Sequence, residues 1–191
     1  ERSAPRKVRI MADEMCVSGV IPSLIPKIFS AFPGIVTEIV PAGSPGGFDI
    51  FIRCERNDGT LSIEDSSALI GSVHAACVTS NTAFIGRGDI WNLPEKVCLA
   101  VWSRYSSMLP TGFLHRTSLV SYSPDSILKF VASSPDTLGI LPLDAAKNSG
   151  LALLPVDLSS LELDLMISPA DGFAGDPFYY FFKNLLVEQY C

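Results

Sequence analysis

Apolar and polar positions follow two periods along this chain, and the two periods predict short strands that alternate with helices. The clearest helical period covers residues 18–32, where apolar residues recur at the spacing of one helical face. We expect the Ser18 hydroxyl to cap the start of this helix, Pro26 to bend it and Pro33-Gly34 to end it. Its apolar face is predicted to comprise Val20, Ile21, Leu24, Ile25, Ile28, Phe29 and Phe32.

The runs on either side of this helix are typical of strands. Residues 7–11 alternate before it, and the β-branched residues of 35–40 follow it. Residues 41–47 read as a loop, and Asn57-Asp58-Gly59 as a turn. Further strands are predicted at 48–54, 73–79, 97–102, 115–122, 137–141, 151–156 and 161–167.

Helix-start signals recur in the second half of the chain. Ser123 as cap, Pro124 at the first helical position and Asp125 in the first turn together predict a helix. Asp176-Pro177 repeats this signal before a last helix. The apolar face of that last helix is predicted to comprise Phe178, Phe181, Phe182, Leu185 and Leu186.

Other segments are less regular. Residues 143–149 suit a short helix, and 103–112 a polar loop that carries Arg104. Residues 81–94 suit a helix or turn anchored by Trp91 and Leu93.

The order of these elements predicts an α/β fold with mostly parallel sheets. A strand–helix–strand unit occurs at residues 8–40 and again at 115–141. Two units of similar size indicate two lobes, each with a sheet of its own.

Composition narrows the classes of function. The chain has 191 residues, of which 48% are hydrophobic, so it can build a substantial core. Its net charge is −6, and its 14 Lys and Arg residues are spread out, which argues against nucleic-acid binding by this chain itself. No apolar run reaches the length of a membrane span, so we expect no membrane contact.

The five cysteines form neither a metal-binding spacing nor an even set of disulfide partners. Their odd number favours a reducing compartment, and we expect a cytoplasmic location. The first residue is Glu1 rather than Met, so we expect the chain to be part of a longer protein.

The residues do not indicate catalysis. His74 lies in an apolar run and His115 beside Arg116, and no nucleophile stands at a recognisable spacing from either histidine. The glycines at 46 and 47 follow a strand without a helix behind them, which is not the pattern of a phosphate loop. We therefore predict no enzyme, no cofactor and no metal site.

Four stretches of the chain resemble the effector-binding domain of LysR-type transcriptional regulators. They are VRIMAD with IPSLIPKIFSAFPGIVTEIV, GFDIFIR, ALIGSVHAACVTSNTAF with GDIWNL, and DSILKFVASSPDTLGILPLDAAK. Their order and spacing carry the resemblance from about residue 8 to about residue 188. The chain departs from the family in a shorter segment between Val40 and Phe48, and in Ser133-Ser134-Pro135-Asp136, where the family has a run of small residues and glycine.

The resemblance implies a type-2 periplasmic-binding-protein fold, with two α/β lobes joined by two crossing strands. Lobe one would comprise residues 1–72 and 168–191, and lobe two residues 73–167. A small-molecule effector would bind in the cleft between the lobes. The family also implies an N-terminal helix-turn-helix domain, absent from this chain, that carries DNA binding. A homodimer of domains that pair side by side is implied as well, through a strand edge and a helix of each lobe, with residues 18–32 and 80–91 as the exposed candidate surfaces.

Loops after strands and the starts of helices are the usual ligand positions in open α/β sheets. Ser18 and Ser123 could hold a carboxylate together with helix N–H groups, and Arg104 could add a bidentate contact. Alternatively, both serines only cap helices and Arg104 is a solvated charge. Asp13 and Asp125 could instead select a cationic or hydroxyl-bearing ligand, so the charge of the effector stays open. The predicted ligand-binding residues are Asp13, Met15, Ser18, Thr79, Ser103, Arg104, Ser123 and Asp125.

Two other functions share this fold. The first alternative is a solute-binding protein of an ABC-type transporter, which would need a leader or lipid anchor upstream. The second is an enzyme, which the lack of a catalytic constellation disfavours. The leading hypothesis is the effector-sensing domain of a bacterial LysR-type regulator.

Overall fold

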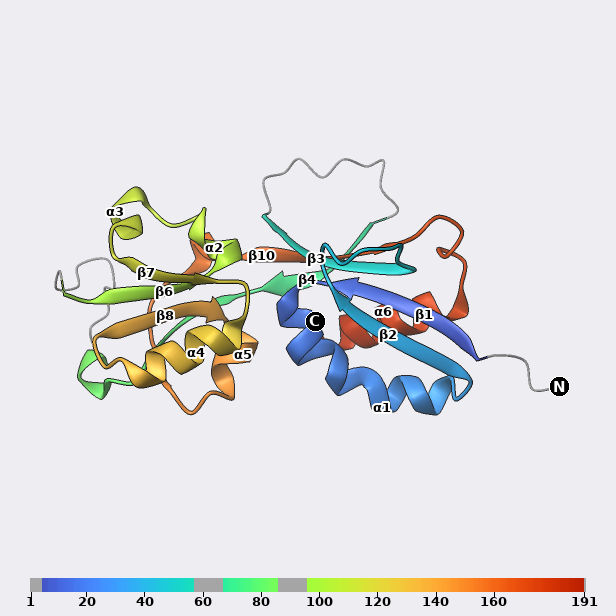
Figure 1. The fold of residues 1–191 in the computed structure, drawn as a ribbon, viewed down its shortest axis with the longest axis horizontal. Helices are drawn as coiled ribbons and strands as arrows, with labels where there is room; N and C mark the ends of the chain where they lie inside the picture. The colour runs from blue at the N-terminus through green and yellow to red at the C-terminus, as the bar shows by residue number, and fades with distance from the viewer. Residues whose placement is uncertain (1–4, 57–66, 86–95, 191) are drawn as a thin grey trace. The chain divides into compact units, whose positions relative to one another are not determined.

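Two compact units, each built on a five-stranded mixed sheet, make up the chain (Figure 1). The computed structural model describes residues 5–56, 67–85 and 96–190. Lobe one comprises Glu1–Ser72 and Leu163–Cys191, and lobe two comprises Val73–Glu162. The chain therefore passes between the lobes twice, after Ser72 and after Glu162.

The sheet of lobe one has the strand order β2-β1-β3-β10-β4. Its strands are β1 (Arg6–Ala12), β2 (Ile35–Pro41), β3 (Ile50–Arg56), β4 (Ala68–Val73) and β10 (Leu163–Pro169). β1 is parallel to β2 and β3, whereas β10 is antiparallel to β3 over its whole length. This pairing corrects the boundary expected at residue 168, because residues 163–167 hydrogen-bond within the sheet of lobe one.

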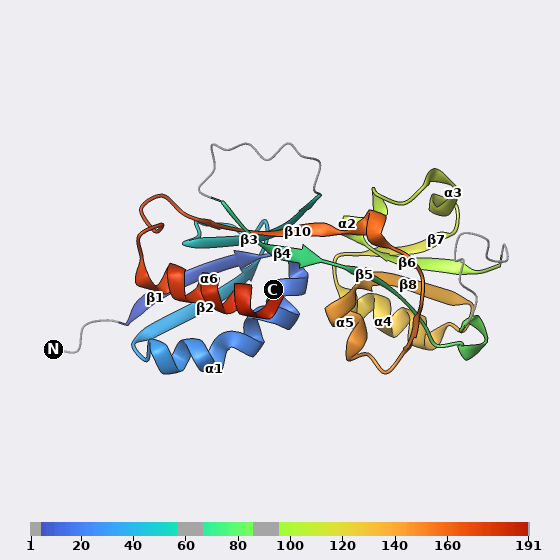
Figure 2. The same ribbon diagram turned by 180° about the vertical axis from the view of Figure 1, so that it is seen from behind.

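Lobe one has a long N-terminal helix and a C-terminal helix. The helical segments are η1 (Cys16–Val20), α1 (Ile21–Ala31) and α6 (Pro177–Tyr190). α6 lies across one face of the β1–β2 part of the sheet, as Figures 1 and 2 show from opposite sides. The predicted cap is confirmed, because the Asp176 carboxylate accepts a hydrogen bond from the Phe178 N–H at 2.9 Å. Tyr179 rather than Phe181 completes the buried face of α6.

The first helix begins earlier than the sequence pattern predicts. Helical backbone is continuous from residue 14 to residue 31. The Ser18 hydroxyl therefore caps nothing and instead donates to the Glu14 carbonyl at 2.8 Å. The buried stripe is also narrower than predicted, since Phe29 is 65% exposed and only Ile21, Leu24 and Ile28 of α1 are buried.

Asp13 connects three elements at the start of this helix. Its N–H donates to the Ile52 carbonyl at 3.1 Å, and its carboxylate accepts from the Cys54 N–H at 2.7 Å, so it extends the pairing of β1 with β3. Its carbonyl accepts from the Cys16 and Val17 N–H groups in the first helical turn. Asp13 is only 4% exposed, which makes this carboxylate part of the core structure.

The sheet of lobe two has the strand order β7-β6-β8-β5-β9. Its strands are β5 (Ala75–Thr79), β6 (Cys98–Trp102), β7 (Thr117–Ser121), β8 (Thr137–Pro142) and β9 (Ala152–Leu154). β6 is parallel to β7 and β8, whereas β5 is antiparallel to β8 and β9. The helical segments are η2 (Thr82–Phe84), α2 (Ser103–Ser106), α3 (Thr111–Leu114), α4 (Pro124–Ser133), α5 (Leu143–Lys147) and η4 (Ser159–Leu161).

Two sequence predictions for lobe two need correction. The single strand predicted at 73–79 is interrupted at His74 and divided between β4 and β5. The polar loop predicted at 103–112 contains α2, so Arg104 lies in a helical turn. The turn predicted at 57–59 and the anchors Trp91 and Leu93 lie outside the described residues.

α4 packs closely against the sheet of lobe two at Gly139 on β8. A Cβ atom at this glycine would lie 2.9 Å from Cγ2 of Val131 and of Val78, and 3.2 Å from Cγ2 of Ile127. These three side chains are β-branched and have restricted χ1 rotamers, so they cannot easily move away. The absence of a side chain at Gly139 therefore sets the distance between helix and sheet.

Gly139→Ala is expected to lower the free energy of unfolding by about 1–3 kcal/mol, the usual cost of overpacking a core. Urea unfolding followed by circular dichroism measures this. The matched control is Gly112→Ala in α3 of the same lobe, where an added Cβ meets nothing within 4 Å. Equal stability of the Gly139 variant and the wild type would contradict the packing argument.

Asp13→Ala is expected to lower the free energy of unfolding by about 1–3 kcal/mol, because it leaves the buried Cys54 N–H without this acceptor. Asp13→Asn keeps an acceptor oxygen and should cost less. The measurement is urea unfolding of both variants beside wild type. If Asp13→Ala and Asp13→Asn both lowered the free energy of unfolding by the same small amount, the hydrogen bond to Cys54 would not be important for folding.

Candidate functional site

The parallel strands of lobe two end at one edge of the sheet, and this edge gathers several of the predicted ligand residues. β6, β7 and β8 run in the same direction, so the residues that follow Trp102, Ser121 and Pro142 lie on the same side. We call this surface the lobe-two edge and define it by Ser103, Arg104, Tyr122, Ser123 and Asp125. It is the usual position for a ligand in an α/β sheet.

Ser103 begins α2 directly after β6. Its side-chain oxygen is shielded from solvent and has no hydrogen-bond partner among the described residues. The neighbouring Tyr105 is buried, and its ring packs edge to face against that of Trp102, with 5.2 Å between the ring centroids. These two buried rings anchor the α2 turn, which carries Ser103 and the exposed Arg104, to the core of lobe two.

Ser123 occupies the predicted cap position of α4, but its hydroxyl does not cap the helix. No side-chain cap hydrogen bond forms, and the Ser123 N–H donates to the Ser121 hydroxyl at 3.1 Å. The Ser123 hydroxyl is therefore not used by the first turn of α4, within the described part of the chain. Asp125 lies exposed in that first turn, where a carboxylate is favourable next to the positive end of the helix.

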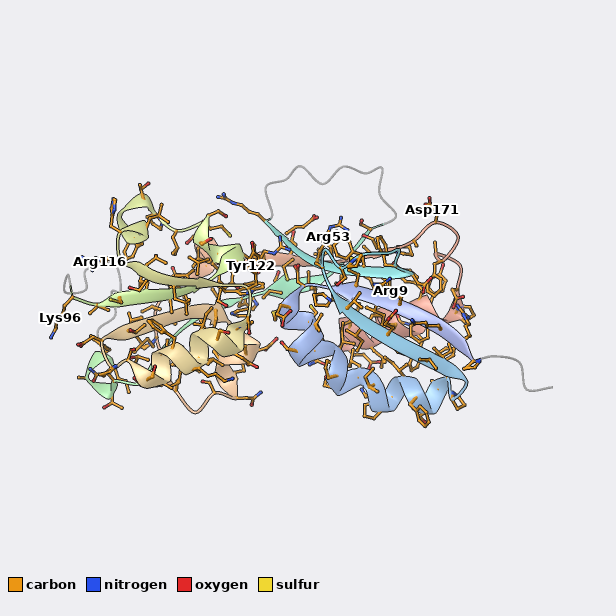
Figure 3. All side chains as sticks on the ribbon, viewed as in Figure 1. Arg9, Arg53, Lys96, Arg116, Tyr122 and Asp171 are labelled. Atoms are coloured by element: carbon orange, nitrogen blue, oxygen red, sulfur yellow. The ribbon has the colours of Figure 1, made fainter. Side chains whose placement is uncertain are left out.

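Tyr122, which lies between β7 and the start of α4, is a candidate site residue that the sequence pattern did not indicate (Figure 3). Its side chain is 76% exposed, and its carbonyl accepts from the indole N–H of Trp102 at 2.9 Å. The backbone is thus anchored while the ring is open to solvent. An aromatic residue between a strand and a helix cap was the signal that could have identified it.

Thr79 does not belong to the lobe-two edge. Because β5 runs antiparallel to β8, Thr79 pairs with Leu138 near the start of β8, at the opposite end of the sheet. Its side chain is fully buried and accepts from the Asn81 N–H at 3.1 Å. His74, which precedes β5, instead lies beside the end of β8, since its carbonyl accepts a hydrogen bond from the Leu143 N–H at 2.8 Å.

The three predicted residues of lobe one lie together after β1 but differ in exposure. Asp13 and Met15 are buried, and the Asp13 carboxylate is already bonded to Cys54. Ser18 is exposed on the outer side of the helix. A role for these residues in ligand binding stays a prediction.

Arg53 is a second cation near the end of β3 (Figure 3). Its guanidinium donates to the Ser168 hydroxyl at 2.6 Å and to the Ser67 hydroxyl at 3.3 Å, and it pairs with Glu55. It also lies over the Phe51 ring, 5.6 Å from the ring centroid. These contacts connect β3, β10 and the start of β4, so Arg53 has a structural role within lobe one.

The described cysteines are suited to packing. Cys16, Cys54 and Cys77 are buried, and burial raises the pKa of the Cys77 thiol to about 12. This thiol stays protonated near neutral pH and is a poor nucleophile. Within residues 5–56, 67–85 and 96–190, no three His, Cys, Asp or Glu side chains are grouped as metal ligands.

The same described ranges contain no helix with the length and apolarity needed to cross a membrane.

Comparison with known proteins identifies similarity at the level of structure only. No protein-family model and no curated protein sequence matches the chain. A putative transcriptional regulator from Vibrio parahaemolyticus superposes with a TM-score of 0.70 at 13% identity, over 99% of this chain and 97% of that one. The reduced regulatory domain of OxyR2 from Vibrio vulnificus gives a TM-score of 0.71 at 12% identity, over 98% of both chains.

A full-length OxyR variant from Pseudomonas aeruginosa gives a TM-score of 0.75 at 12% identity, over 96% of this chain and 74% of that one. These neighbours are regulatory domains of LysR-type regulators, or contain one. Identities this low establish the fold alone. The chain has the two-lobe α/β fold of the regulatory domains of LysR-type transcription regulators, as the resemblance implied.

Proposed function

We propose that this chain is the effector-sensing regulatory domain of a bacterial LysR-type transcription regulator and is not an enzyme. The observation that carries the proposal is the end-to-end match of its fold to isolated regulatory domains, at 97–98% of their length. DNA binding would belong to a helix-turn-helix domain outside this chain, and the protein would act in the cytoplasm. No feature of the described residues favours the transporter alternative.

The effector in this proposal is a small polar molecule that contacts the lobe-two edge. The Ser103 hydroxyl has no hydrogen-bond partner among the described residues, and the Ser123 hydroxyl does not cap α4. Arg104 places a planar cation at the same edge. The exposed Tyr122 ring offers a flat apolar surface beside them. A carboxylate is the first ligand class to test, because hydroxyls and a guanidinium recognise it through charge-assisted hydrogen bonds.

A thermal-shift screen of this chain against small carboxylates, amino acids, sugars and aromatic acids is expected to identify one class that raises Tm in a concentration-dependent way. The double variant Ser103→Ala/Ser123→Ala should then bind that ligand about tenfold more weakly, the cost of two net hydrogen bonds. Titration calorimetry measures the affinity.

The matched control is Ser133→Ala at the far end of α4, whose hydroxyl donates to the Phe130 carbonyl. This variant should bind as the wild type does. No stabilising ligand in any class, with a well-folded sample, would contradict effector sensing by this chain. If Arg104→Ala bound the ligand with unchanged affinity, Arg104 would not be part of the binding site.

We also propose a homodimer through lobe one. β2 is an edge strand of its sheet, and Val36 on β2 and Phe29 on α1 are large exposed apolar side chains. A shallow groove of about 570 Å³ lies between α1 and α6, with a Lys27–Glu188 ion pair of 3.9 Å. The groove is lined by Pro26, Lys27, Ser30, Ala31, Phe181, Leu185 and Glu188. The second surface expected from the sequence, residues 80–91, lies partly outside the described residues.

Phe29→Glu is expected to weaken the dimer at least about tenfold, because a charge replaces an apolar contact in the interface. Analytical ultracentrifugation over a concentration series measures the dissociation constant. Leu114→Glu in α3 is the matched control, because Leu114 is also a large exposed apolar side chain but lies outside both expected dimer surfaces, and it should leave the dissociation constant unchanged. A wild-type chain that is monomeric at every concentration would overturn the dimer.

A further inference from the structure

The helix after β1 contains two different hydrogen-bonding registers. Residues 14–15 and α1 (Ile21–Ala31) are α-helical, but the five residues between them form the π-helix η1 (Cys16–Val20). The Ile21 N–H donates to the Cys16 carbonyl, five residues back, whereas an α-helix would direct it to Val17. π turns are rare in proteins and are frequent at functional positions.

Pro22 contributes to the π turn at this place, although Pro26 lies inside α1 without one. A proline inside a helix has no N–H to donate, and its ring clashes with the carbonyl four residues earlier, here that of Ser18. The wider turn directly before Pro22 moves that carbonyl away from the ring. The α register is therefore penalised at this turn, so the energy difference between the two registers is smaller than in an ordinary helix.

The sequence around the π turn can bury an apolar side chain in either register. Cys16-Val17 and Val20-Ile21 are two adjacent apolar pairs separated by one turn. Cys16 and Ile21, one π turn apart, are both fully buried here, while Val17 and Ile21 would align in an α register. On the outer side, an added Cβ at Gly19 meets nothing within 4 Å, so packing on that side does not hold the register.

The two ends of this helix have different roles. Its start is fixed by Asp13, whose carboxylate binds the Cys54 N–H. Its last turns line the groove between α1 and α6. The centroid of the Phe32 ring lies 5.4 Å from that of Phe178 and 5.3 Å from that of Phe181, both on α6. Changing a π turn to an α turn alters the helix by one residue, which is about 1.5 Å along the axis and about 100° of rotation. Because Asp13 fixes the start of the helix, this shift and rotation would move the later turns of α1, which line the groove.

We propose that residues 16–20 are a two-register switch, π in this structure and α in a second state, which moves the α1 side of the groove against α6. The regulatory part rests on the proposed function: a dimer partner on the groove would favour one register by its difference in affinity for the two registers. The switch gives lobe one a discrete element that connects the end of β1 to the dimer surface.

Pro22→Ala tests the switch in the 191-residue chain, because it removes the ring clash and lets the intrinsic preference for the α register act. Through-hydrogen-bond NMR couplings identify the acceptor of the Ile21 N–H, which is expected to change from Cys16 to Val17. The methyl resonances of Ala31 and Leu185 in the groove should shift at the same time. The dimer dissociation constant should change about fivefold or more, the lower range of allosteric coupling.

Pro33→Ala, just after the helix, is the matched control and should leave the acceptor of the Ile21 N–H and the dimer dissociation constant unchanged. Gly19→Ala is a second variant for the case in which Pro22→Ala folds poorly; its methyl fits the open space and it should favour the α register as well. An Ile21 N–H that stays on Cys16 in both variants would overturn the switch. A changed acceptor with unmoved Ala31 and Leu185 resonances would overturn the link to the groove. The effector screen and the Phe29 test do not need a register change, so the proposed function can fail or succeed independently.

Discussion

The buried carboxylate of Asp13, bonded to the Cys54 N–H, is the contact on which the arrangement of lobe one depends. It closes the end of β1 against β3 and places the Asp13 carbonyl where the first helical N–H groups can reach it. The helix must then start at residue 14, so Pro22 falls in its interior rather than in its first turn. The π turn lies directly before Pro22, and the groove is lined by the last turns of the same helix.

In lobe two, a close approach between helix and sheet has the equivalent role. Gly139 lets α4 lie against β8, and α4 begins where β7 ends. Because β6 and β7 are parallel, the start of α4 is brought to the same edge as the start of α2. Ser103 and Ser123 share this edge through strand direction, although 20 residues separate them in the chain.

The proposed function joins these local arrangements into one regulatory domain. The lobe-two edge supplies hydroxyls, a cation and an exposed aromatic ring, while lobe one supplies an apolar surface of α1 and β2. Few residues of the chain are shared with its structural neighbours, at 12–13% identity, yet the fold is matched over nearly its whole length. The physical requirement that is shared is the pattern of buried strands and covering helices, which many sequences satisfy. Ligand contacts lie outside this pattern and are free to differ.

The sequence by itself determined the α/β class, most strands, the cap of α6 by Asp176 and the position of Ser123 at the start of α4. These features depend on local periodicity and on side chains within one helical turn, which a single sequence displays directly. Tertiary structure decided that Thr79 lies at the opposite end of the sheet from Ser103, and that residues 163–167 join lobe one. It also decided that Ser18 lies inside a helix and that Phe29 is exposed. Strand direction, pairing partner and helix start are set by contacts between residues far apart in the chain. Local sequence patterns do not predict those contacts.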